Sequence, residues 1–361
     1  MDKSRQVVVM YLISHIGLIF FLYPADIIAS LSVGHWSAIL FGFVCHVAML
    51  AIFTKGLGCF DALNVIDIFQ GVGKIFAFFT LLPVLLYFVM ILIIAVRAYS
   101  EIVTEIFLGE TPLWTIMLLF VAVSTFISLL GIESIFRTGV LVALLFLPLL
   151  LFVLVLSFQN ADWHYVLPLI DRQAASFSYV IGRPYLQSLF AFVGGFMFLG
   201  FVPSHVPFKG RYVVGASFLL LPMFLVSVYV PLLTFGENTA SRFPFPFIMA
   251  VDTVSISWLM FDRVTMFFML SLICFLLLFL ALVMWNTIQM LKRGLPFIRP
   301  AAANILLAAL VLVFCLLIPN WQLVERLLWW NTSLRLYAAI VIPCLTLALG
   351  MRHRRKGVVQ P

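Results

Sequence analysis

The chain has 361 residues, of which 65% are hydrophobic and only 10% are charged, and its mean hydropathy is +1.20. No water-soluble domain could cover so much apolar surface with so few charges, so the composition excludes a soluble protein. The net charge of +7 comes from short basic clusters between apolar segments. That pattern encodes membrane topology and does not indicate nucleic-acid binding.

Ten apolar stretches follow one another along the chain, each long enough to cross a hydrocarbon core of about 30 Å. They are continuous rather than alternating, which favours helices over a membrane barrel. We therefore predict an all-α polytopic membrane protein that forms a single membrane domain over residues 1–361. The predicted spans are 7–30, 35–54, 75–100, 113–131, 138–158, 185–204, 212–234, 257–290, 301–318 and 334–350.

The distribution of Lys and Arg predicts the orientation of these spans. With a cytoplasmic N-terminus, fourteen of the 21 basic residues fall on the inside and seven on the outside or at outer helix ends. The positive-inside rule then places both termini in the cytoplasm, with residues 351–361 as a basic cytoplasmic tail. Arg335 is counted among the outer residues, and Arg97 and Glu101 are expected to pair across one helical turn.

Ten spans divide into two halves of five, and the second half would begin on the opposite side of the membrane. We predict an inverted repeat of the LeuT-like kind, with 7–158 as the first five-helix repeat and 185–350 as the second. The first helix of each half carries glycine followed by proline. These are Gly17 with Pro24 in helix 1, and Gly194 and Gly195 with Pro203 in helix 6.

Glycine and proline weaken helices, and matched interruptions in both halves point to a binding site near the middle of the membrane. We therefore expect helices 1 and 6 to be discontinuous, unwound near 15–17 and 193–196. The alternative is that these glycines allow close packing between helices.

Several local patterns resemble the spore germination permease family, the B-type membrane subunits of nutrient germinant receptors. The family is related to the amino acid/polyamine/organocation transporters. The matching features are Gly17 with Pro24, the segments 163–169 (WHYVLPL) and 188–196 (SLFAFVGGF) with Pro203, and 243–246 (FPFP) leading to 260–263 (MFDR). One departure lies beside Gly17, where relatives usually carry a small polar residue and this chain has His15, Ile16 and Leu18.

The resemblance implies a nutrient germinant receptor subunit in the inner membrane of the spore. It would sense a small molecule, such as an amino acid or a similar nutrient. It would trigger germination together with an A-type membrane subunit and a C-type lipoprotein. No nucleic-acid partner is expected. The alternative function is a proton- or sodium-coupled amino acid permease, and a subunit lining a conducting pathway is a third possibility.

The ligand site is expected between helices 1, 3, 6 and 8, where exposed backbone groups and apolar side chains would meet the nutrient. The candidate ligand-binding residues are His15, Ile16, Gly17, Tyr87, Phe192, Gly194, Gly195 and Phe196. His15 could couple protons, but a neutral imidazole bonded to a backbone carbonyl is the preferred interpretation. No second ionisable residue is expected near it, and the absence of Asp or Glu deep in the spans favours a receptor over a proton-coupled carrier.

No catalytic motif is present, so the chain is not expected to be an enzyme. Neither a cofactor nor a metal site is expected. The five cysteines form no CxxC pair and read as buried free thiols.

Overall fold

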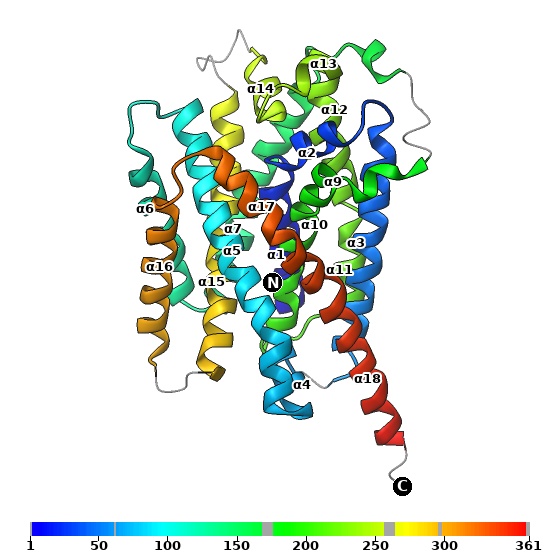
Figure 1. Cartoon of the computed structure of the whole chain (residues 1–361), viewed down its shortest axis with the longest axis vertical. Helices are drawn as coiled ribbons and strands as arrows, with labels where there is room; N and C mark the ends of the chain where they lie inside the picture. Colours follow the sequence, from blue (N-terminus) through cyan, green and yellow to red (C-terminus); the bar gives the residue numbers. More distant parts are fainter. Residues whose placement is uncertain (1, 61–62, 168–175, 256–263, 295–297, 359–361) are drawn as a thin grey trace.

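The computed structural model describes residues 2–60, 63–167, 176–255, 264–294 and 298–358. Within these ranges all regular structure is helical, and the long helices stand side by side as one bundle (Figure 1). Seven helical segments are long and apolar enough to cross a membrane. A bent pair and two shorter apolar helices account for the rest of the ten predicted spans.

Most spans lie close to their predicted bounds. The first half contains α1 (Lys3–Ile19), α2 (Tyr23–Ser30), α3 (His35–Leu57), α4 (Val65–Val72), α5 (Lys74–Ile106), α6 (Leu113–Leu129) and α7 (Ile132–Leu156). The connection to the second half carries two 3-10 turns, η1 (Trp163–Val166) and η2 (Ser178–Ile181). The second half begins with α9 (Arg183–Ser188), α10 (Phe190–Gly194), η3 (Met197–Phe201), α11 (Gly210–Ser217) and α12 (Leu220–Phe235). It ends with α13 (Glu237–Ala240), α14 (Pro246–Asp252), α15 (Thr265–Gly294), α16 (Pro300–Leu316), α17 (Trp321–Leu336), η4 (Tyr337–Val341) and α18 (Ile342–Val358).

Helix 1 is broken, but not where the sequence predicted. Residues 15–17 are helical, α1 continues to Ile19, and α2 leaves it at an angle of 58°. Pro24 explains this position, because a proline has no N–H and its ring clashes with the carbonyl four residues earlier, which here belongs to Phe20. A Cβ on Gly17 would lie 3.3 Å from the Cβ of Phe275 in α15, so Gly17 serves close helix packing instead of unwinding.

The sixth predicted span, called helix 6 here, contains α9, α10 and η3 and is distinct from α6. It is broken within the predicted segment. The α-helical hydrogen bonding of α10 stops at Gly194, Gly195 and Phe196 form a turn, and the chain continues as the 3-10 helix η3. At this turn the N–H of Phe196 donates to the carbonyl of Val193, three residues back. The carbonyl of Phe192, its partner in a regular α-helix, is therefore free for another donor.

The last span is longer than predicted, which corrects the start at residue 334. It runs from Trp321 to Arg354 and includes a π-helical segment, η4, between α17 and α18. Pro343 follows η4 and cannot donate a hydrogen bond back to the carbonyl of Ala339, which loosens the helix at this point. The early start carries Arg335 into the helix interior, away from the outer end where it was predicted.

The bundle has two distinct ends (Figure 1). One end carries α4, the C-terminal half of α18, the end of α15 and the start of α16, and the opposite end carries α13 and α14. We call the first the basic end, because it is rich in Lys and Arg. Its basic residues are Lys55, Lys74, Lys292, Arg293, Arg299, Arg352 and Arg354.

Candidate functional site between the broken helices

Four spans meet at Gly194, just before the break in helix 6. A Cβ at this position would lie 2.9 Å from Cδ1 of Leu18 in α1 and 3.1 Å from Cδ1 of Ile91 in α5. The ring of Phe279 in α15 would be 3.5 Å away. The predicted spans 1, 3, 6 and 8, which correspond to α1, α5, α10 and α15 at this point, therefore converge at one glycine. A ligand site between these spans stays a prediction.

The aromatic residues of the predicted site lie on another face of helix 6. Residues two apart on a helix point in nearly opposite directions, whereas residues four apart share a face. Phe192 and Phe196 accordingly face His46 in α3, with ring centroids 5.7 and 5.6 Å from the imidazole. Phe192 also stacks on Phe224 of α12. The predicted residues thus divide between two sides of one helix.

His15 joins the two broken helices. Its side chain is fully buried. Its Nδ1 lies 2.8 Å from the carbonyl oxygen of Tyr11, and its Nε2 lies 3.3 Å from the freed carbonyl oxygen of Phe192. A neutral imidazole carries only one N–H, so it can donate to one of these two oxygens at a time. A Cβ on Gly195 would collide with the imidazole, so a glycine at this position makes room for His15.

A second histidine lies beside His15, which corrects the expectation that no other ionisable residue would be near. The ring of His46 is 5.0 Å from that of His15, and its Nε2 lies 2.7 Å from the hydroxyl of Tyr11. We call Tyr11, His15 and His46 the histidine cluster. The signal for it was visible as a histidine in each of the first two apolar spans, but the pairing of these spans in space was not.

The carbonyl of Gly17 is also satisfied by a side chain from another helix. The last four carbonyls of any helix lack intrahelical partners, and the break after Ile19 places Gly17 among them. The buried hydroxyl of Tyr99 in α5 donates to this oxygen, and the Tyr99 ring stacks on Phe21 in the break. Sequence reasoning selected Tyr87 on this helix and missed Tyr99.

Arg335 is a buried charge inside the bundle. One guanidinium nitrogen donates to the carbonyls of Leu186 and Gln187 at the end of α9, at 3.1 and 2.8 Å. The other terminal nitrogen donates to the carbonyl of Leu328 at 3.3 Å. Tyr87 and Asp26 lie within electrostatic range of the guanidinium. These contacts attach the last span to α9, the first part of the sixth predicted span.

Several buried polar atoms on Arg335 and near it have no hydrogen-bond partner within the described part of the chain. They include Nε of Arg335, the hydroxyl of Tyr87, and the amide nitrogen and oxygen of the Asn331 side chain, one turn before Arg335. Buried polar groups normally have hydrogen-bond partners, so such a group of unsatisfied atoms indicates a place where a polar ligand or water can bind. Ile16 is buried in α1. Tyr87 lies within electrostatic range of Arg335.

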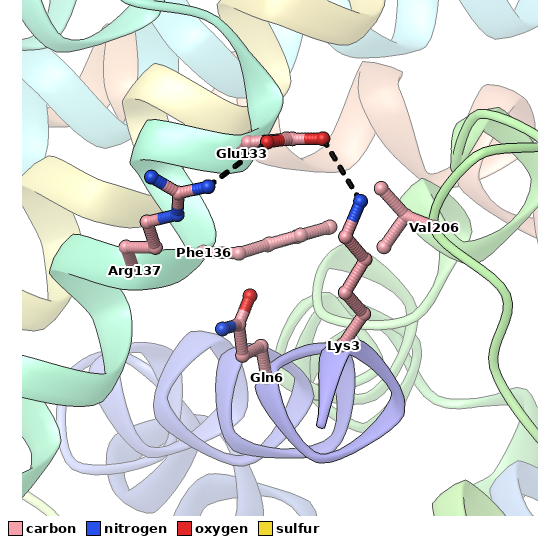
Figure 2. A pocket seen from close by; sticks show the side chains of 6 residues that line it. All are labelled: Lys3, Gln6, Glu133, Phe136, Arg137 and Val206. Atoms are coloured by element: carbon pink, nitrogen blue, oxygen red, sulfur yellow. Dashed lines mark hydrogen bonds and ion pairs between the residues drawn. The ribbon is translucent and has the colours of Figure 1, made fainter. Parts of the chain in front are cut away.

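The end of α1 that carries Lys3 is held by a charged network around a cavity of about 280 Å³ (Figure 2). Nζ of Lys3 lies 3.1 Å from Oε1 of Glu133 at the start of α7. Arg137 approaches the second carboxylate oxygen at 3.2 Å, and Nε2 of His205 lies 3.4 Å from the first.

The predicted ion pair of Arg97 with Glu101 is also present. Residues 260–263 lie outside the described part of the chain.

No group of His, Cys, Asp and Glu side chains within the described ranges has the arrangement of a metal site.

Comparison with solved structures gives the fold class. A manganese transporter from Eremococcus coleocola, crystallised with an aromatic bis-isothiourea substituted compound, matches with a TM-score of 0.61. It is 17% identical, over 94% of this chain and 78% of the transporter. MhsT in complex with L-phenylalanine matches with a TM-score of 0.58 and 13% identity, over 96% of this chain and 98% of MhsT. The chain therefore has the LeuT-like fold of polytopic membrane transporters.

Comparison with family models then gives the family. The chain belongs to the family described as "Spore germination protein", whose Spore_permease model matches residues 3–322. The resemblance found in the sequence is thereby confirmed. A comparison with curated proteins yields no match.

Proposed function

We propose that this chain is the nutrient-sensing membrane subunit of a spore germinant receptor. Family membership and the transporter fold support a germination role for a nutrient-related membrane protein. In this proposal it resides in the inner spore membrane with both termini in the cytoplasm. It would work with an A-type membrane subunit and a C-type lipoprotein.

The observation that carries the proposal is the convergence of four spans at Gly194. The side chains of Leu18 and Ile91 are already within contact distance of the space that a Cβ would occupy. A nutrient can enter here only when the helices separate, so binding favours the separated state. A ligand shifts such an equilibrium by no more than its differential affinity for the two states.

The proposed nutrient is small and zwitterionic or uncharged. The site would offer an apolar wall from Leu18, Ile91 and Phe279, and backbone groups at the two helix breaks would orient the polar end of the ligand. His15, Ile16, Gly17, Gly195, Phe192, Phe196 and Tyr87 remain proposed ligand-binding residues. Tyr11 and His46 are proposed to act behind His15, by holding its imidazole against the break in helix 6.

The test uses spores that carry the full receptor. Gly194→Leu should fill the convergence point, and the spores should lose the response to their nutrient while germinating normally with an agent that bypasses receptors. Gly215→Leu is the matched control, because a Cβ there meets nothing within 4 Å. The amount of receptor in the membrane is measured for both variants.

A second variant keeps the test informative if Gly194→Leu fails to assemble. Ile91→Ala enlarges the same point, and removal of methylene groups from a binding pocket changes affinity by roughly 10- to 200-fold. The nutrient concentration for half-maximal germination should therefore shift at least about tenfold. A normal nutrient response from both variants at normal receptor level would place the site elsewhere.

A stand-alone amino acid permease is the second candidate. The observation that favours it is the presence of ionisable side chains inside the bundle, in the histidine cluster and at Arg335, since such residues commonly line ion or substrate pathways. Uptake of radiolabelled amino acids into proteoliposomes that contain only this chain would support it. Binding without uptake would support the receptor.

A further inference from the structure

Two adjoining cavities lie at the basic end of the bundle, away from the proposed nutrient site. The larger, of about 1110 Å³, lies between α4, the start of α5 and the end of α15. The smaller, of about 420 Å³, continues from it along α5 and α16. Leu85, Leu291 and Lys292 line both cavities, so the two spaces form one continuous groove.

The chemistry of the groove changes along its length. The larger cavity carries the basic side chains of Lys74, Lys292 and Arg293 on a wall that is otherwise mostly apolar, and no carboxylate is among its described lining residues. Arg293 is paired with Asp67 of α4 at 2.6 Å, which fixes α4 against the end of α15. Lys74 and Lys292 form no ion pair within the described part of the chain and are exposed, so their charges are available to a ligand.

The smaller cavity is apolar and faces the lipid. Its wall includes Leu86, Leu306 and Phe314, whose side chains are about half exposed on the outside of the bundle. At a rise of about 1.5 Å per residue, Ala303 and Phe314 lie roughly 16 Å apart along α16. That length matches half of a hydrocarbon core of about 30 Å, which is the depth of one leaflet.

From this arrangement we infer a binding site for an anionic phospholipid. The phosphate of the headgroup would lie against Lys74 and Lys292, and one acyl chain would fill the groove between α5 and α16. A basic pocket between helices joined to a leaflet-deep apolar channel fits both parts of such a lipid. A zwitterionic lipid would fill the channel equally well but would gain much less from the lysines.

The test is native mass spectrometry of the purified full chain in detergent, titrated with phosphatidylglycerol or with phosphatidylcholine of the same acyl chains. The wild type should retain phosphatidylglycerol in preference. Lys74→Gln combined with Lys292→Gln should lower its apparent affinity roughly 30-fold, the loss expected for two lysines near an anionic headgroup. Ala303→Trp should fill the channel and reduce retention of both lipids.

The matched control is Lys55→Gln combined with Arg352→Gln, which removes the same charge from the same end of the bundle outside the groove. This control should retain phosphatidylglycerol as the wild type does. Equal retention of both lipids by the wild type would overturn the inference, as would an equal loss in the control. Unchanged retention of phosphatidylglycerol by the double lysine variant would also overturn the inference. A helix of a partner subunit would then be the better candidate for the groove.

Discussion

His15 and Tyr99 show how single side chains stabilise broken helices inside a membrane. A helix end without hydrogen-bond partners is costly in a bilayer, where no water replaces them. The imidazole of His15 lies against the Phe192 carbonyl that the break in helix 6 releases, and the Tyr99 hydroxyl serves the Gly17 carbonyl near the break in helix 1. Residues from neighbouring helices thus satisfy one released carbonyl at each break, which helps both breaks to persist.

Removal of the Tyr99 hydroxyl tests this role. Tyr99→Phe should leave the buried Gly17 carbonyl unpaired and destabilise the protein by about 1–3 kcal/mol, the cost of an unsatisfied buried acceptor. The melting temperature of the purified chain in detergent measures the effect. Tyr212→Phe is the matched control, because this tyrosine lies on the surface and is half exposed. Equal melting temperatures for Tyr99→Phe and wild type would contradict the assignment.

At the scale of the element, helix 1 is shaped by its proline more than by its glycine. The break occupies residues 20–22 and begins at Phe20, whose carbonyl can accept no hydrogen bond from Pro24. Gly17 lies three residues earlier and packs on α15. A proline in a helix interior costs about 3 kcal/mol or more. That is enough to decide where a helix bends when neighbouring side chains can satisfy the freed groups.

Replacement of this proline should straighten the helix. Pro24→Ala supplies an N–H for the Phe20 carbonyl and favours a continuous helix from α1 into α2. A structure of the variant should show an angle well below the present 58°. Spores with the variant should need more nutrient to germinate. Pro112→Ala, at the cap of α6, controls for the general effect of losing a proline. An unchanged bend would show that packing rather than Pro24 sets the break.

An element could be predicted from the sequence where the pattern within its own segment was strong. Ten spans and the break in helix 6 were predictable, because long apolar runs and the pair Gly194–Gly195 act locally. The last span was misplaced because its first half mixes polar residues with aromatic ones, such as Asn331 and Trp330. Asn331 is buried, and its burial depends on neighbouring helices. The histidine cluster and the environment of Arg335 need the packing of several spans, and no single segment contains that information.

The whole molecule has a charge asymmetry that should orient it. The basic end carries a cluster of seven Lys and Arg residues, named above, and positive charge is retained on the cytoplasmic side of membranes. In a background without the five native cysteines, Trp163→Cys in η1 should react with an impermeant thiol reagent in intact cells. Arg352→Cys in α18 should react only after permeabilisation. Labelling of Arg352→Cys in intact cells would reverse the orientation.

In the proposed function, two contact regions of α1 distinguish a sensor from a transporter of the same fold. In the proposed function the nutrient separates helices that meet at Gly194, while the network of Lys3, Glu133 and Arg137 holds α1 against α7 at the other end of the path. A transporter would release that network to let its substrate pass. A receptor needs only the first movement, which partner subunits can detect.

The most direct measurement is a structure of the assembled receptor at a saturating concentration of the nutrient that germinates its spores. The account predicts density for the nutrient between Leu18, Ile91, Gly194 and Phe279, in contact with backbone groups at both helix breaks and with these side chains moved apart. Nutrient density on a partner subunit or elsewhere in this chain, with the four helices still in contact at Gly194, would contradict it.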